Sequence, residues 1–107
     1  MRRHTLDAVI ASMPAHFHPE ACRGVQAVYQ WHVSGDGGRD YHIVIDDGTY
    51  RVVDGVAASP DVTMRADLDT YLRLANGELK PMIAVLTRKL LIHGNIFLGA
   101  KMDHIFR

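Results

Sequence analysis

Histidine is the residue type best able to do chemistry in this sequence, which contains seven of them. His16 and His18 are one residue apart in a probable loop, and His32, His42 and His93 fall on segments with strand-like alternation. Zinc sites need three or four ligands at recognisable spacing. The sequence contains neither H-E-x-x-H nor C-x-x-C. The pattern therefore favours solvated strand histidines, and we predict no metal site.

Nucleophiles lack the local context that catalysis requires. Ser12 falls in a predicted helix, Ser34 and Ser59 fall in turns, and there is no G-x-S-x-G elbow. The GDGG turn lacks the Lys and Ser/Thr of a phosphate loop. The lone Cys22 cannot form an internal disulfide, which suits a reducing compartment. We predict no catalytic residue and no cofactor.

Composition and charge exclude several classes of protein. The chain has 107 residues, 48% of them hydrophobic, which is typical of one globular domain, here residues 1–107. Twelve basic and twelve acidic side chains give no net charge and no basic stripe, so nucleic-acid binding is not expected. The apolar stretch after Asp7 is shorter than a secretory leader needs, and no run approaches a membrane span. We expect a cytoplasmic protein without stable membrane insertion.

Hydrophobic periodicity first predicts a helix and then a set of strands. Leu6, Val9, Ile10 and Met13 recur at helical spacing, so a helix should begin after Thr5 and end near Met13, before Pro14. The period then changes to two. Four strands are predicted, over residues 25–33, 41–46, 49–53 and 61–66.

Capping residues predict the remaining elements. Asp67 should cap a helix that Asn76-Gly77 ends, and Pro81 fits the first turn of a further short helix. Residues 90–93 read as a fifth strand, and Asn95 should cap the last helix. The expected fold is α+β, with a five-stranded, mainly antiparallel sheet covered on one face by helices.

The last helix is apolar over a wider arc than a surface helix needs. One stripe consists of Leu98, Met102, Ile105 and Phe106, and an offset stripe of Ile96, Phe97 and Ala100. The second stripe could pack on a neighbouring helix, line a ligand site or form a dimer. The residues alone leave these alternatives open.

Three segments, in order, resemble the sterol carrier protein-2 (SCP2) lipid-binding domain family. They are FHPEACRGVQAVYQWHVSG, SPDVTMRADLDTYLRLANGELKP and LTRKLLIHGNIFLGAKM, and the resemblance runs from about Phe17 to Phe106. One departure is Arg88, where many relatives carry glycine. If this position needs a positive φ, arginine is strained there and the turn differs locally.

The resemblance implies an apolar tunnel between sheet and helices that binds fatty acids, fatty acyl-CoAs, sterols or phospholipids without catalysis. The candidate lining residues are Trp31, Ile43, Val52, Met64, Leu72, Met82, Leu86, Phe97 and Met102. An alternative hypothesis is an enzyme or biosynthetic accessory that acts on a polyketide, terpenoid or quinone precursor in the same pocket. A third is an interaction module, since the chain could be a monomer or a homodimer.

Overall fold

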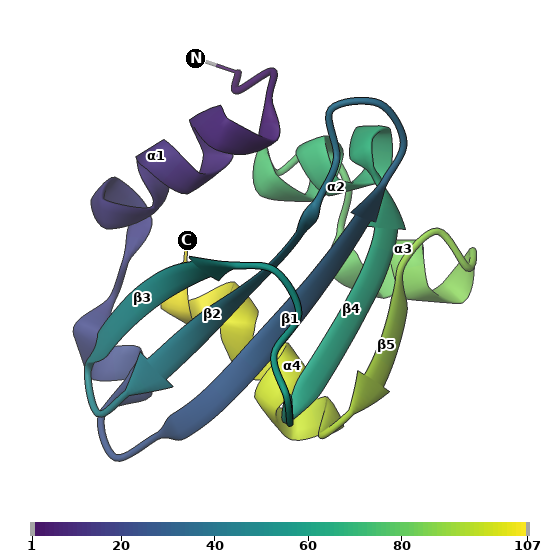
Figure 1. The fold of residues 1–107 in the computed structure, drawn as a ribbon. Helices are drawn as coiled ribbons and strands as arrows, with labels where there is room; N and C mark the ends of the chain where they lie inside the picture. The colour runs from purple at the N-terminus through teal and green to yellow at the C-terminus, as the bar shows by residue number, and fades with distance from the viewer. Residues whose placement is uncertain (1, 107) are drawn as a thin grey trace.

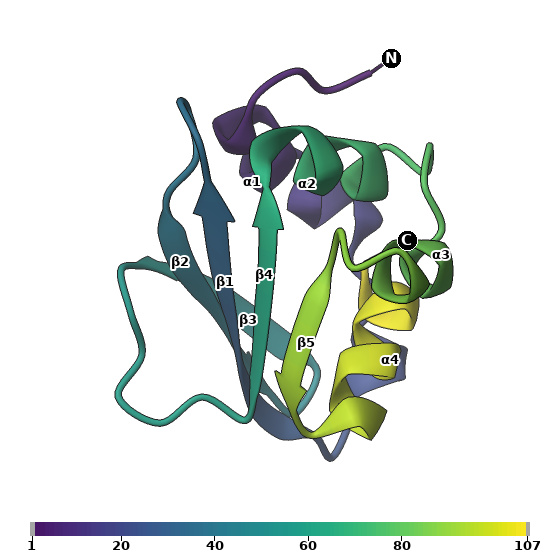
Figure 2. The ribbon, with the colours of Figure 1, turned by 90° about the vertical axis from the view of Figure 1, so that its right-hand side faces the viewer.

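A computed structural model describes residues 2–106 of the chain as a single sheet with helices packed on one face (Figures 1 and 2). The order of strands across the sheet is β3-β2-β1-β4-β5. The helical elements are α1 (Leu6–His16), the short 3-10 helix η1 (Pro19–Cys22), α2 (Leu68–Ala75), α3 (Pro81–Leu86) and α4 (Ile96–Ile105). The strands are β1 (Gln26–Ser34), β2 (Asp40–Asp46), β3 (Thr49–Asp54), β4 (Val62–Asp67) and β5 (Leu91–Gly94).

The sheet is mixed, although most of its pairings are antiparallel as predicted. β1 pairs with β2, β2 with β3, and β4 with β5, all antiparallel. The fourth pairing, between β1 and β4, is parallel, with Trp31 opposite Met64. The connection from β3 to β4 therefore crosses the sheet instead of making a hairpin, and Figure 2 shows it on the side away from the helices.

Gln30 on β1 fixes this crossover to the outer face of the sheet. Its side chain is fully buried, and its Nε2 donates to the carbonyl oxygens of Tyr41 at 3.1 Å and Gly55 at 3.2 Å. Its Oε1 accepts a hydrogen bond from the backbone nitrogen of Ala57 at 2.7 Å. One amide thus satisfies backbone groups that the connection would otherwise bury without partners.

The predicted helix starts are confirmed by capping hydrogen bonds. The side chains of Thr5, Asp67 and Asn95 each accept from a backbone nitrogen in the first turn of α1, α2 and α4. The predicted end of the first helix was wrong, because α1 continues through Pro14 to His16. A proline so close to the C-terminal end removes one backbone hydrogen bond, and the helix continues for only two more residues.

Arg88 adopts the left-handed conformation, with φ of 60°, in the turn between α3 and β5. The turn therefore keeps a positive φ although arginine occupies the position. A side chain with a Cβ is strained in this region, so the substitution has a conformational cost.

The segment that follows α1 and the C-terminal end of α4 meet at the β3 edge of the sheet. Phe17 and Phe106 form an isolated β-bridge, and the backbone nitrogen of His18 donates to the carbonyl of Ile105 at 2.8 Å. The rings of Phe17 and Phe106 pack on Tyr50 of β3, with centroids 4.6 and 5.0 Å from the tyrosine ring. This aromatic cluster packs the ends of α1 and α4 against β3.

Candidate ligand-binding region

Four of the sequence-predicted lining residues lie on the helix-facing side of the sheet, in two adjacent cross-strand rows. Trp31 and Met64 are register partners on β1 and β4, and Ile43 and Val52 are partners on β2 and β3. Side chains at paired positions share one face. Trp31, Ile43 and Met64 are buried and Val52 is partly buried, so the structure brings these residues together under the helices.

Two further candidates approach this face from the helices. Leu72 on α2 is buried, and the neighbouring Tyr71 sets the edge of its ring against Trp31, with centroids 5.1 Å apart and planes at 86°. Met102 on α4 is partly buried against the same core. The six inward-facing candidates therefore belong to one continuous apolar cluster.

The other three candidates lie on the surface. Met82 and Leu86 on α3 are 73% and 72% exposed, and Phe97 on α4 is 87% exposed. They belong to a larger group of exposed apolar side chains, which we call the apolar rim: Met82, Ile83, Val85, Leu86, Leu91, Ile96 and Phe97. Of the large hydrophobic residues exposed within residues 2–106, Val56 alone lies outside this rim.

Helix α3 carries most of the rim and is weakly anchored. Ala84 is its one buried residue. The carbonyl oxygen of Ala84 also accepts hydrogen bonds from the backbone nitrogens of Lys89 at 2.8 Å and Leu90 at 3.1 Å. The attachment of α3 thus depends largely on a single methyl group and the turn that follows it.

Three tyrosines provide the polar groups between the two layers. The hydroxyl of Tyr29 donates to the carbonyl oxygen of Leu98 on α4 at 2.7 Å, and the hydroxyls of Tyr41 and Tyr71 are hydrogen-bonded to each other at 2.7 Å. Burial raises the pKa of Tyr29 and that of Tyr71 to about 12, and raises the pKa of Tyr41 well above 10. These phenols stay neutral near neutral pH, so they can donate hydrogen bonds but are poor general bases.

The strand histidines lie on the opposite face of the sheet. His32 Nδ1 is 2.8 Å from a carboxylate oxygen of Asp40, and His42 Nδ1 is 3.1 Å from the carbonyl oxygen of Gly55. His93 is exposed on β5. Within the described residues, no group of three His, Cys, Asp or Glu side chains could hold a metal ion.

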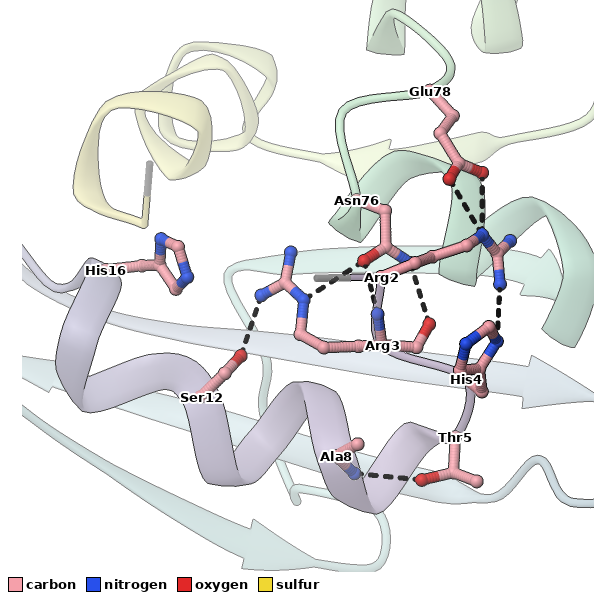
Figure 3. A pocket seen from close by; sticks show the side chains of 9 residues that line it. All are labelled: Arg2, Arg3, His4, Thr5, Ala8, Ser12, His16, Asn76 and Glu78. Atoms are coloured by element: carbon pink, nitrogen blue, oxygen red, sulfur yellow. Dashed lines mark hydrogen bonds and ion pairs between the residues drawn. The ribbon is translucent and has the colours of Figure 1, made fainter.

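A hollow of about 750 Å³, lined mostly by polar and charged residues, opens where the N-terminal segment and α1 meet the end of α2 (Figure 3). Its polar groups satisfy one another. Arg3 and Asn76 exchange backbone and side-chain hydrogen bonds at 2.8 and 2.9 Å, and the Arg3 guanidinium donates to Ser12 Oγ at 2.7 Å and to the carbonyl of Ala75. Arg2 pairs with Glu78 at 2.7 Å. These contacts hold the N-terminal segment on α2, and the hollow lies apart from the residues predicted to line the apolar tunnel.

Comparison with known proteins assigns the fold and sequence to a family. The model of the SCP-2 sterol transfer family matches residues 7–107, so the chain belongs to this family. Lipid binding or transfer is the general property that membership supports. The family domain is a lipid-binding fold that is generally non-enzymatic, and it also occurs within multidomain proteins.

Individual relatives include both stand-alone domains and parts of longer chains. Hydroxysteroid dehydrogenase-like protein 2 of Mus musculus is 33% identical over 87 residues, which cover 80% of this chain but 18% of the relative. Palmitated SCP2L2 from Aedes aegypti has a TM-score of 0.78 at 24% identity and covers 95% of this chain and 94% of its own. The sec-alkylsulfatase Pisa1 from Pseudomonas sp. has a TM-score of 0.78 at 18% identity, over 96% of this chain and 16% of its own.

The chain thus spans about a fifth of the curated dehydrogenase-like relatives that it matches. No helix within residues 2–106 is long and apolar enough to cross a bilayer.

Proposed function

We propose that this domain binds one hydrophobic ligand between the inner face of the sheet and helices α3 and α4, without transforming it. The ligand class is a fatty acid, fatty acyl-CoA, sterol-like molecule or phospholipid. The observation that carries the proposal is the apolar rim, which places seven exposed large apolar side chains at a single edge of the molecule. A concentration of exposed apolar side chains is typical of a binding site in a folded protein.

A route leads from the rim to the buried candidates. On β5, Ile92 is partly buried, is the register partner of Met64 and lies beneath Gly99 of α4. Met64 in turn pairs with Trp31. If α3 moves outward about Ala84, a hydrocarbon chain entering over Ile92 would lie along this row. The aromatic cluster at the β3 edge would form the closed end.

Apolar burial alone provides enough free energy for binding. Each buried methylene contributes about 0.8 kcal/mol, so ten methylenes would contribute about 8 kcal/mol. That value corresponds to roughly micromolar affinity before the cost of ordering the ligand and α3 is subtracted. The tyrosine hydroxyls would then be needed only to orient the headgroup of the ligand. Because these hydroxyls are neutral, they support a binding role rather than acid–base chemistry.

The single tryptophan makes the proposal directly testable. Because Trp31 is in the predicted ligand row, titrating delipidated protein with palmitate should change its fluorescence, and palmitate should displace a fluorescent fatty acid. Palmitate is chosen because the structurally similar Aedes aegypti SCP2L2 is described as palmitated. Denaturing extraction of untreated protein, followed by mass spectrometry, should release lipid. No emission change, no displacement and no extracted lipid would reject the proposal.

A pair of variants separates a lining residue from general surface hydrophobicity. Met102→Gln keeps the length of the side chain but places an amide at the inner side of α4, so we expect the affinity for palmitate to fall about tenfold. Val56→Ser removes an exposed apolar side chain away from the rim and should leave the affinity unchanged. Equal affinities for both variants would place the ligand elsewhere.

A further inference from the structure

We propose that the apolar rim, together with four basic side chains around it, is a docking surface for an anionic lipid bilayer. The first observation is the amount of apolar surface. Phe97, Ile96, Leu86 and Met82 are each more than 70% exposed, and they come from α3 and the first turn of α4. Figures 1 and 2 place α3 and the start of α4 at the two ends of β5, which is the edge strand of the sheet.

The second observation is the charge of the same segment. Residues 79–102 contain Lys80, Arg88, Lys89 and Lys101 but no Asp or Glu. The remainder of the chain therefore holds eight basic and twelve acidic residues, so the two parts carry opposite net charge. All four basic residues are exposed, and none forms a salt bridge with any residue between 2 and 106.

Acidic side chains next to this segment are mostly engaged elsewhere. Glu78 is paired with Arg2, and the carboxylate of Asp67 caps α2 through the backbone nitrogen of Thr70 at 2.8 Å. Asp103 is exposed on α4, nearly two turns beyond the rim residues of that helix. The segment that bears the rim therefore carries net positive charge, and its acidic neighbours are Asp67, which interacts with Lys89, and Asp103.

An anionic bilayer fits this combination better than a second copy of the chain. Apolar side chains can enter the headgroup boundary while neighbouring Lys and Arg remain at the charged surface. A symmetric dimer through the rim would instead bring the four basic residues of each copy together without acidic partners. This inference rests on the proposed lipid-binding function, because docking would bring the proposed ligand route to the bilayer. Vesicle binding and ligand binding are measured separately, so either can fail without the other.

Co-sedimentation with vesicles tests the docking surface. The protein should sediment with phosphatidylserine-containing vesicles, bind weakly to vesicles of phosphatidylcholine alone, and lose binding as salt rises. Lys101→Glu should weaken partitioning into anionic vesicles at least fivefold, because it replaces electrostatic attraction to the lipid headgroups with repulsion. Phe97→Ser should weaken it about tenfold, because the aromatic ring no longer enters the bilayer. Both positions are exposed, so both variants should fold, which circular dichroism checks.

Two control variants match these changes outside the rim. Arg51→Glu reverses an exposed charge on β3, on the outer face of the sheet, and Val56→Ser removes an exposed apolar side chain from the β3–β4 connection. Both should partition like the unmodified protein. Equal losses in the control variants would overturn the assignment of the surface.

Other occupants of the rim give different results. Light scattering could show a dimer that Phe97→Ser converts to a monomer. If the protein then also failed to bind vesicles, the rim would be a self-interface and bilayer docking would be rejected. Binding to soluble polyglutamate as tight as binding to anionic vesicles would point to an acidic protein and also reject it. Palmitate titrations of the same variants show whether ligand binding is lost independently of vesicle binding.

Discussion

The hydroxyl of Tyr29, in the middle strand of the sheet, donates a hydrogen bond to the carbonyl oxygen of Leu98 in α4 at 2.7 Å. Tyr29 is fully buried. Gly99, the next residue of α4, faces Ile92 and Val62, so the helix lies close to β4 and β5 there. This single contact therefore connects the central strand with the helix that bears part of the apolar rim.

Tyr29→Phe should loosen α4 without disturbing the sheet. The change leaves the Leu98 carbonyl without its tyrosine donor, and we expect a loss of about 1–2 kcal/mol in unfolding free energy. Urea denaturation would measure the loss, and hydrogen exchange should rise mainly in α4. Tyr50→Phe is the matched control, because the Tyr50 ring packs in the aromatic cluster and should tolerate the change. An equal loss in both variants would contradict a specific role for Tyr29.

The buried tyrosines predict instability at alkaline pH. Burial raises the folded-state pKa of Tyr29 and Tyr71 from 10.0 to about 12. The folded state therefore favours the neutral phenol, and the stability that this contributes is complete below about pH 10 and is lost as the pH rises through about 12. Urea midpoints measured across this range should fall, and the fall should be smaller in Tyr29→Phe. A flat profile would show that the phenols titrate alike in both states.

Gln30→Leu should be strongly destabilising although leucine is similar in size. The change leaves the nitrogen of Ala57 and the carbonyl of Gly55 without their Gln30 partner, at an expected cost of about 2–3 kcal/mol. Thermal unfolding would measure this cost. Gln26→Leu is the control on the same strand, since Gln26 is exposed and its side chain donates to the carboxylate of Asp46. Proteolysis at the β3–β4 connection should increase in the first variant alone.

Arg88→Gly should stabilise the protein by roughly 0.5–1 kcal/mol. Glycine adopts the observed φ of 60° without strain, and its greater freedom in the unfolded chain offsets part of the gain. Arg88→Ala removes the same charge but keeps a Cβ, so it separates conformational strain from electrostatics. Thermal midpoints should rise for glycine and not for alanine. Equal thermal midpoints for Arg88→Gly and Arg88→Ala would indicate that arginine is unstrained in this turn.

Gly94→Ala should disrupt the junction between β5 and α4. Gly94 has φ of 101°, and a Cβ there would collide with the backbone carbonyl of Asp61, which accepts the hydrogen bond from Asn95 at 3.0 Å. Gly55 has φ of 95° but open space around its Cβ position, so Gly55→Ala reports the cost of the backbone conformation alone. We expect Gly94→Ala to cost at least 2 kcal/mol more than Gly55→Ala in chemical denaturation.

Features that depend on residues close together in the chain were predictable from the sequence. Thr5, Asp67 and Asn95 cap helices because each side chain reaches a nitrogen three residues ahead. The Asp47-Gly48 hairpin was predictable for the same reason, since both residues take the positive φ that such a turn requires. Alternation also placed Trp31 and Ile43 on the buried face, because neighbouring side chains on a strand point to opposite faces.

The tertiary structure decided features that depend on distant segments. The parallel pairing of β1 with β4 and the burial of Gln30 both follow from the crossover between β3 and β4, which no local pattern encodes. The orientation of α3 is a similar case. Its sequence is apolar on nearly every position, so periodicity could not tell which side chains face the core. Packing buried Ala84 and left Met82 and Leu86 exposed, and that outcome produced the apolar rim.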